Sequence, residues 1–250
     1  MLSHRTTVGA LAASVVGALA ALTMLTSCDD SKSTTESKVF DFTGQSLVID
    51  ARETALVIDH GASSQITVER TLKGNASEPG KATLALEDGV LKTWVECSGV
   101  TFSCEGSHTV HVPPGVAVEL KGSGTSVRGD GLSGDLTAEL SNDATITLNA
   151  PSGALDLQAR GGGITVTDAK SPTVNAVVQT DGNVSLGFAT APQSVKATST
   201  GGSAEVALPS GQETYRVDAG ALEGLVSDPA SGRTVLVQAG EGRATVTKAG

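Results

Sequence analysis

The second half of the chain alternates apolar and polar residues in short runs. Within "LDLQARGGGITVTD", Leu155, Leu157 and Ala159 occupy alternate positions, and Ile164 and Val166 repeat the pattern after a glycine turn. Side chains at alternate positions of a β-strand point to the same face. The pattern therefore predicts short strands that each bury one face. Outside the apolar N-terminal segment, no stretch has the periodicity of an amphipathic helix.

A turn of glycine and small polar residues separates these strands and recurs along the second half. Its copies are "KGSGTSV" at 121, "SNDATITL" at 141, "RGGGITV" at 160, "TDGNVSL" at 180, "TGGSAEV" at 200, "GALEGLV" at 220 and "GEGRATV" at 240. The spacing of about 20 residues is typical of stacked structural repeats. The second half is therefore expected to be built from one repeated supersecondary unit.

Two architectures fit these strands and turns. The turns could join antiparallel strands in a meander or sandwich, or form the corners of a coil in which equivalent strands stack in parallel. Glycines fall at nearly the same place in each repeat, as stacked corners require. We therefore expect an all-β fold with a right-handed β-helix or solenoid over residues 116–250. An irregular β-rich section over residues 39–115 is expected to cover its upstream end.

The run "RGGGITV" could alternatively be a phosphate-binding loop. Such a loop leads into a helix, whose N-terminal amide groups hold the anion. Here the glycines are followed by β-branched residues at alternate positions, which predict a strand. The three glycines are therefore interpreted as a structural turn.

The first 27 residues, 1–27, have the pattern of an export signal. Arg5 precedes a run of apolar and small residues that ends at "LTSC". No charged residue lies between Arg5 and Asp29. This ending resembles the lipobox of bacterial lipoproteins, with Leu25 three places before Cys28. The resemblance implies cleavage before Cys28 and a diacylglyceryl anchor on its sulfur, at the extracytoplasmic face of the cell membrane. The alternative is a retained membrane-spanning helix.

The segment after the cysteine is predicted to be a flexible tether. Residues 28–38, "CDDSKSTTESK", contain no apolar residue apart from the cysteine itself. A segment that has nothing to bury does not recover the entropy lost on folding. The folded part is therefore expected to begin near Val39.

Composition narrows the classes of partner. The chain carries 27 acidic against 17 basic residues, for a net charge of −10, and has only four Phe, one Trp and one Tyr. Nucleic-acid binding uses positive charge and aromatic stacking faces. Nucleic acid is therefore excluded as the expected partner, and no motif indicates a cofactor.

Two cysteines remain besides Cys28, and they form the best candidate for a disulfide. Cys97 and Cys104 are followed closely by His108 and His111, so zinc is the alternative. Zinc sites usually space their cysteines more tightly. Residues three apart in a strand also point to opposite faces, which separates the two histidines. Export to an oxidising compartment favours the Cys97–Cys104 disulfide. These histidines and His60 are expected to be ordinary surface or strand residues.

The acidic residues of the repeated turns are the remaining candidate ligands. Calcium-binding β-helix repeats place carboxylates at the same position of successive turns. Here the acids Asp143, Asp181, Glu223 and Glu241 occupy different positions, and no two adjacent repeats match. They are interpreted as solvated surface charges, and no metal site is predicted.

The recurring turn and strand resemble the "TGSGDV" repeat of the bacterial putative-adhesin family, a domain of unknown function that lipoproteins often carry. The "VPPGVAVEL" segment and the two-cysteine stretch before it lie within the resemblance, which covers about residues 40–250. It implies a β-solenoid and supplies no catalytic residues. The aspartate of the family repeat is replaced here by residues such as Thr125, Ile164 and Asn183.

These features predict a surface lipoprotein with a non-catalytic binding or scaffolding domain, whose partner is an envelope protein or glycan. The final strand, "ATVTK", ends close to the C-terminus, so we also expect an open edge there that supports self-association. The alternative is a β-helix enzyme that acts on an envelope glycan. Such an enzyme needs clustered carboxylates and sugar-stacking aromatics, and the sequence shows neither pattern.

Overall fold

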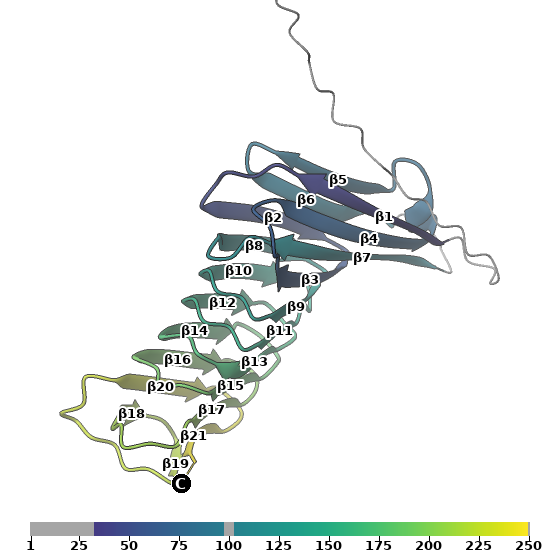
Figure 1. Ribbon diagram of the computed structural model, residues 1–250. Coiled ribbons are helices and arrows are strands. Elements are labelled where there is room, and N and C mark those ends of the chain that lie inside the picture. The colour runs from purple at the N-terminus through teal and green to yellow at the C-terminus, as the bar shows by residue number, and fades with distance from the viewer. Residues whose placement is uncertain (1–32, 98–102, 250) are drawn as a thin grey trace, which may run out of the picture.

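The computed structural model describes residues 33–97 and 103–249, which form an all-β molecule with two large sheets (Figure 1). In this part of the chain the one helical element is a short 3₁₀ turn, η1 (Asn75–Ser77), and no helix is long and apolar enough to cross a membrane. The predicted signal segment and Cys28 lie outside the described residues. The all-β class expected from the alternating pattern is confirmed.

The strands of the two sheets are as follows. The 11-stranded sheet has the order β1 (Ser33–Phe40), β4 (Ile66–Gly74), β7 (Cys104–Val112), β3 (Ala55–His60), β9 (Ser126–Asp130), β11 (Ile146–Asn149), β13 (Ile164–Ala169), β15 (Val184–Phe188), β17 (Ala204–Leu208), β21 (Ala244–Lys248) and β19 (Ala221–Glu223). The 10-stranded sheet has the order β18 (Arg216–Asp218), β20 (Thr234–Ala239), β16 (Ser194–Ser199), β14 (Thr173–Val178), β12 (Leu155–Ala159), β10 (Leu136–Ser141), β8 (Ala117–Ser123), β2 (Ser46–Arg52), β6 (Val90–Val95) and β5 (Ala82–Glu87).

From β8 to β17 the chain alternates between the sheets, one strand in each. We call two such consecutive strands a rung. Each strand pairs in parallel with its equivalent in the next rung, for example Leu136 with Leu155 and Ile146 with Ile164. The antiparallel meander is therefore wrong for this region, because equivalent strands stack directly on one another.

The alternating residues of each rung fill the space between the sheets. Leu136, Ala138 and Leu140 of β10 face Ile146 and Leu148 of β11, and all five are almost fully buried. The same arrangement repeats from rung to rung and forms one continuous apolar core. Small β-branched and aliphatic side chains suit such thin layers, since each rung must fit flat on its neighbours.

Glycines form the corners between the strands, as the repeated turns predicted. A Cβ on Gly182 would overlap the carbonyl oxygen of Gly162 in the rung before it, and a Cβ on Gly202 would overlap that of Gly182. Gly182 also has a φ of 140°, which L-residues rarely adopt. The glycines are therefore needed for close stacking of one turn on the next, which supports a structural role for "RGGGITV".

The N-terminal end departs from the order of the sequence. The rung β2–β3 pairs in parallel with β8 and β9 on one side, and on the other side with β6 and β7, which come later in the chain. The strands β4, β1 and β5 then add in antiparallel orientation. Both sheets therefore run through the predicted boundary at residue 116, and the irregular section completes their upstream end.

The strand β1 corrects the predicted extent of the tether. Ser33–Phe40 pairs with β4 along its whole length, although residues 33–38 were expected to be flexible. Two polar side chains of β1 also have partners: the exposed Glu36 forms an ion pair with Arg70, and Lys38 donates to the Leu84 carbonyl. Polar composition was misleading here because backbone pairing with β4 and these polar contacts replace apolar burial.

The C-terminal end also departs from the order of the sequence. The rung β20–β21 pairs with β16 and β17, and the earlier strands β18 and β19 lie outside it (Figure 1). The final strand is therefore covered by β19, and the prediction that it forms an open edge is wrong. After β17 the chain leaves the next place in each sheet empty and forms β18 and β19 one place further out. The later strands β20 and β21 then fill the empty places, and the uniform repeat spacing does not reveal this order.

Candidate functional site

A groove of about 650 Å³ lies over the outer face of the 11-stranded sheet. It crosses β13, β15, β17, β21 and β19, near the C-terminal end of the molecule. Its lining includes hydroxyl side chains and several charges. We call it the C-terminal groove.

The groove exists because one row of outward positions is filled by small residues. The register aligns Gly187 of β15 with Ala207 of β17, and Ala207 with Thr247 of β21. Thr167 lies on one side of this row and Glu223 on the other, and both line the groove. The missing side chains at Gly187 and Ala207 therefore leave a floor of backbone between walls of longer side chains.

Charged groups surround this floor unevenly. Asp168, Glu205 and Glu223 line the groove together with one basic residue, Arg243. Asp168 sits at a register shift between β13 and β15 and has a φ of 52°, so an extra residue is accommodated at the wall. The excess of carboxylates favours an uncharged polar ligand or a cationic one.

The chemistry of this lining indicates binding. Carboxylates and hydroxyls accept and donate hydrogen bonds to hydroxyl or ammonium groups of a ligand. The register sets Glu205 directly opposite Ser185, and both residues line the groove. The groove therefore offers hydroxyl and carboxylate groups for the recognition of a ligand.

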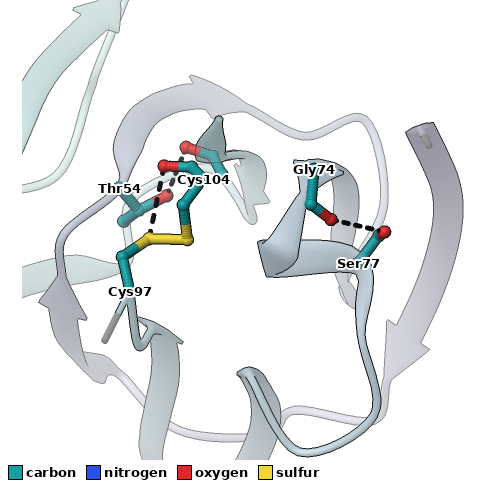
Figure 2. Close-up of a disulfide and its surroundings, with 6 residues drawn as sticks. Thr54, Gly74, Ser77, Cys97 and Cys104 are labelled. Carbon is teal, nitrogen blue, oxygen red and sulfur yellow. Dashed lines mark hydrogen bonds between the residues drawn. A yellow bond between two sulfur atoms is a disulfide. The ribbon is translucent and has the colours of Figure 1, made fainter. Parts of the chain in front are cut away.

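A second hollow of about 390 Å³ lies near the disulfide. The structure joins Cys97 and Cys104, with their Cα atoms 5.8 Å apart, in agreement with the predicted pairing. Cys97 follows β6 of one sheet and Cys104 begins β7 of the other, so the bridge ties the two sheets together. Figure 2 shows it beside Thr54, whose hydroxyl donates to the Gly106 carbonyl at 2.9 Å.

The same figure shows how the neighbouring turn is closed. Ser77 of η1 donates its hydroxyl to the Gly74 carbonyl at 2.7 Å (Figure 2). Gly74 has a φ of 59° and approaches the backbone of Ser103 so closely that a Cβ would overlap it. Tightly packed backbone therefore lies close to the disulfide at this junction of the two sheets.

The buried histidine of the molecule lies near this junction. His108 is 0% exposed, and its Nδ1 is 2.8 Å from the Thr54 hydroxyl oxygen. Because that hydroxyl donates its hydrogen to Gly106, the oxygen accepts from the His108 Nδ1–H. Burial, and then the positive charge of Arg70, lower the pKa of His108 from 6.5 to about 4. The imidazole is therefore neutral at physiological pH.

The other sequence-predicted candidates are scattered. His60 is exposed, and His111 lies on the opposite face of β7 from His108, as the strand geometry predicted. Asp143 and Asp181 lie against the next turns, near Gly161 and Gly201. The list of candidates missed the C-terminal groove. The signal that could have found it is the small residue at an outward position in "VSLGF" and "AEVAL".

The described residues contain no group of three or more His, Cys, Asp or Glu side chains positioned to hold a metal ion. Glu223 is the one turn acid that the groove includes. Cys28, the predicted lipidation site, lies outside the residues that the structure describes.

No protein-family model and no curated protein sequence matches the chain. Among solved structures it is similar to a "putative cell adhesion protein" of Clostridium sporogenes, with 12% identity, a TM-score of 0.39, and 87% of this chain and 100% of that chain covered. It is also similar to a "putative adhesin" of Parabacteroides distasonis, with 16% identity, a TM-score of 0.45, and coverages of 88% and 98%. A "putative lipid binding protein" of the same species has 9% identity, a TM-score of 0.43, and coverages of 86% and 97%.

Proposed function

We propose that this protein is a lipoprotein of the extracytoplasmic membrane face that displays a right-handed β-solenoid as a non-catalytic, adhesin-like binding surface. The observation that carries the proposal is the C-terminal groove, a polar hollow on a rigid stack of parallel strands. Its hydroxyl and carboxylate lining fits the hydroxyl groups of an envelope glycan or the polar surface of an envelope protein. No cofactor is needed for such a role.

The placement of the groove supports a role at a distance from the membrane. The lipidation motif is at Cys28, and the folded chain begins at Ser33. Five residue steps span at most about 18 Å when fully extended. An anchor at Cys28 would therefore hold the N-terminal end of the sheets close to the bilayer. The groove is lined by β13, β15, β17, β21 and β19. These strands lie toward the other end of the stack (Figure 1).

Groove binding is tested by filling the floor. Gly187→Arg places a long side chain where a Cβ has its nearest neighbour at 3.6 Å, so the fold tolerates the change while the hollow is blocked. Thr137→Arg, on an exposed outward position of β10 in the other sheet, is the matched control. We expect the protein to bind isolated cell envelopes, and Gly187→Arg to reduce that binding at least tenfold. Equal binding by all three proteins would refute the groove as the site.

The anchor is tested separately by metabolic labelling with a radioactive fatty acid. We expect label on the wild-type protein and none on Cys28→Ala. Label on the variant would refute the anchor while leaving the groove proposal standing. Turnover of a wall polymer by the purified protein would refute the non-catalytic role.

A further inference from the structure

The two sheets end in four edge strands, and these differ in how well they are protected. At the C-terminal end, the Ser227 hydroxyl is hydrogen bonded to both the N–H and the carbonyl of Val217, and the Asp228 N–H donates to the Tyr215 carbonyl. These contacts occupy the backbone of Val217 in β18 and of Tyr215 just before it. The neighbouring edge β19 has only three residues.

The N-terminal edges show a sharper contrast. The edge strand β5 receives a hydrogen bond from Lys38 at its Leu84 carbonyl. The strand β1 is eight residues long, and within the described chain no strand pairs with its second side. A long edge with free N–H and C=O groups is a template for another strand. Among the strands that the structure describes, β1 is therefore the longest edge with an unpaired side.

The side chains of β1 show which strand could pair there. Glu36 is opposite Arg70 in the ladder and Lys38 is opposite the buried Val68, so both charges are on the inward face. Ser37, between them, is exposed on the outward face. An inward acid and an inward base two positions apart form a self-complementary pattern.

We propose that β1 pairs with β1 of a second copy of this chain, in antiparallel orientation about a two-fold axis at Ser37. This register sets Glu36 of each copy opposite Lys38 of the other, and Thr35 opposite Val39. Opposite charges at directly paired positions stabilise a sheet, and like charges destabilise it. Val39, which is 51% exposed in the single chain, becomes covered by the pairing.

The charge order selects this pairing against its alternatives. An antiparallel register centred on residue 36 pairs two glutamates, and one centred on residue 38 pairs two lysines. Parallel in-register pairing sets both like charges against each other. The two-fold arrangement uses one edge of each copy, so it closes at a dimer and does not extend into fibres.

The two-fold axis allows a direct chemical test. Residues directly opposite in an antiparallel pair have Cα atoms about 4.5 to 5.5 Å apart, which is within disulfide range. We expect Ser37→Cys to give disulfide-linked dimers of the full chain in membranes under mild oxidation. Thr35→Cys, on the same face, would lie about 13 Å from its own copy and is expected to stay monomeric.

The outcomes separate this edge from the C-terminal one. The wild-type chain controls for crosslinks through its own cysteines, and Leu222→Cys reports on β19. Dimers with Ser37→Cys alone support the proposal. Equal crosslinking by Thr35→Cys, crosslinking by Leu222→Cys in place of Ser37→Cys, or monomers throughout would overturn it.

A charge exchange tests the register independently of crosslinking. Glu36→Lys gives a strand with two inward lysines, and Lys38→Glu gives one with two inward glutamates. Each variant alone is expected to self-associate at least tenfold more weakly than wild type in detergent solution, measured by light scattering. A mixture of the two restores both opposite-charge pairs and is expected to form heterodimers. Recovery of no heterodimer from two folded variants would overturn the register.

Discussion

The middle rungs and the N-terminal end of this molecule are parts of the same two sheets, yet they are stabilised differently. Between β8 and β17 every rung repeats the one before it, with an apolar interior and glycine corners. At the N-terminal end, β4 and β1 are antiparallel, a disulfide joins the sheets, and the interior contains Arg70, His108 and Thr54. Some of these polar atoms, such as His108 Nε2, have no hydrogen-bond partner among the residues that the structure describes.

This difference follows from what each region must do. A middle rung is covered on both sides by copies of itself, so apolar layers and stacked corners are sufficient. An end rung has no further rung on one of its sides. Its exposed strand edge and the apolar interior behind it must therefore be covered by other groups. Ion pairs, a disulfide and short covering strands serve that purpose here.

The largest effect is expected from removing the inserted rung at the C-terminal end. Truncation after Arg233 removes β20 and β21, and with them the only strands that pair with β18 and β19. The buried Val235, Val237 and Val246 are lost as well. At 1.5 to 3 kcal/mol for each buried valine, we expect a loss of about 5 to 9 kcal/mol in the free energy of unfolding.

Chemical denaturation of the truncated chain and of a chain ending at Lys248 provides the measurement. The longer chain keeps both ladders and is expected to unfold like wild type. If the chain ending at Arg233 were as stable as wild type, the inserted position of β20–β21 would be wrong.

The next effect tests the stacked corners of the middle rungs. Gly182→Ala adds a Cβ that overlaps the Gly162 carbonyl at a φ of 140°. Strain and steric overlap together are expected to cost more than about 4 kcal/mol. Gly187→Ala is the control, because its Cβ has ordinary space and no positive φ; a change within about 1 kcal/mol is expected. Similar melting temperatures for the two variants would contradict the corner model.

These two regions also differ in how far the sequence predicts them. The middle rungs were predictable because one local pattern, alternation plus a glycine turn, specifies each rung and its neighbour. The order of the rungs at the ends was not predictable. At the C-terminal end, for example, Gly220 and Gly240 keep the regular spacing although β19 lies outside β21. The strand β1 was missed because its partner Arg70 is distant in sequence. The groove was missed because it arises from the absence of side chains at Gly187 and Ala207.

The buried histidine makes the N-terminal end sensitive to acid. The pKa of His108 is lowered to about 4, so the folded state resists a proton that the unfolded chain accepts below about pH 6.5. Its contribution to stability is complete above pH 6.5 and is lost as the pH falls through 4. A shift of this size corresponds to about 3 kcal/mol. Urea unfolding between pH 7.5 and 4.5 measures the slope.

His108→Gln is expected to flatten this slope whatever its effect on stability at neutral pH. His60→Asn is the matched control, since it removes an exposed histidine of the same chain. A slope that persists in His108→Gln would assign the acid sensitivity to the carboxylates.

The smallest of these effects is expected at the disulfide, which joins the sheets only at the N-terminal end. The bridge closes a loop with a sequence separation of 7, and the chain-entropy model gives about 2 to 3 kcal/mol for so short a loop. Cys97→Ser with Cys104→Ser should therefore lower the unfolding free energy by that amount. Buried contacts such as Val95 packed beneath Gly106 remain after the bridge is removed, which keeps the fold intact. Thiol titration of the wild-type chain, with and without reductant, checks that the bridge forms.

Because the middle rungs contain no cysteine, hydrogen exchange should increase in β6 and β7 of the variant and stay unchanged from β10 to β17. An increase spread evenly over both regions would mean that the two ends of the stack unfold as one unit, and the contrast between them would then be one of architecture alone.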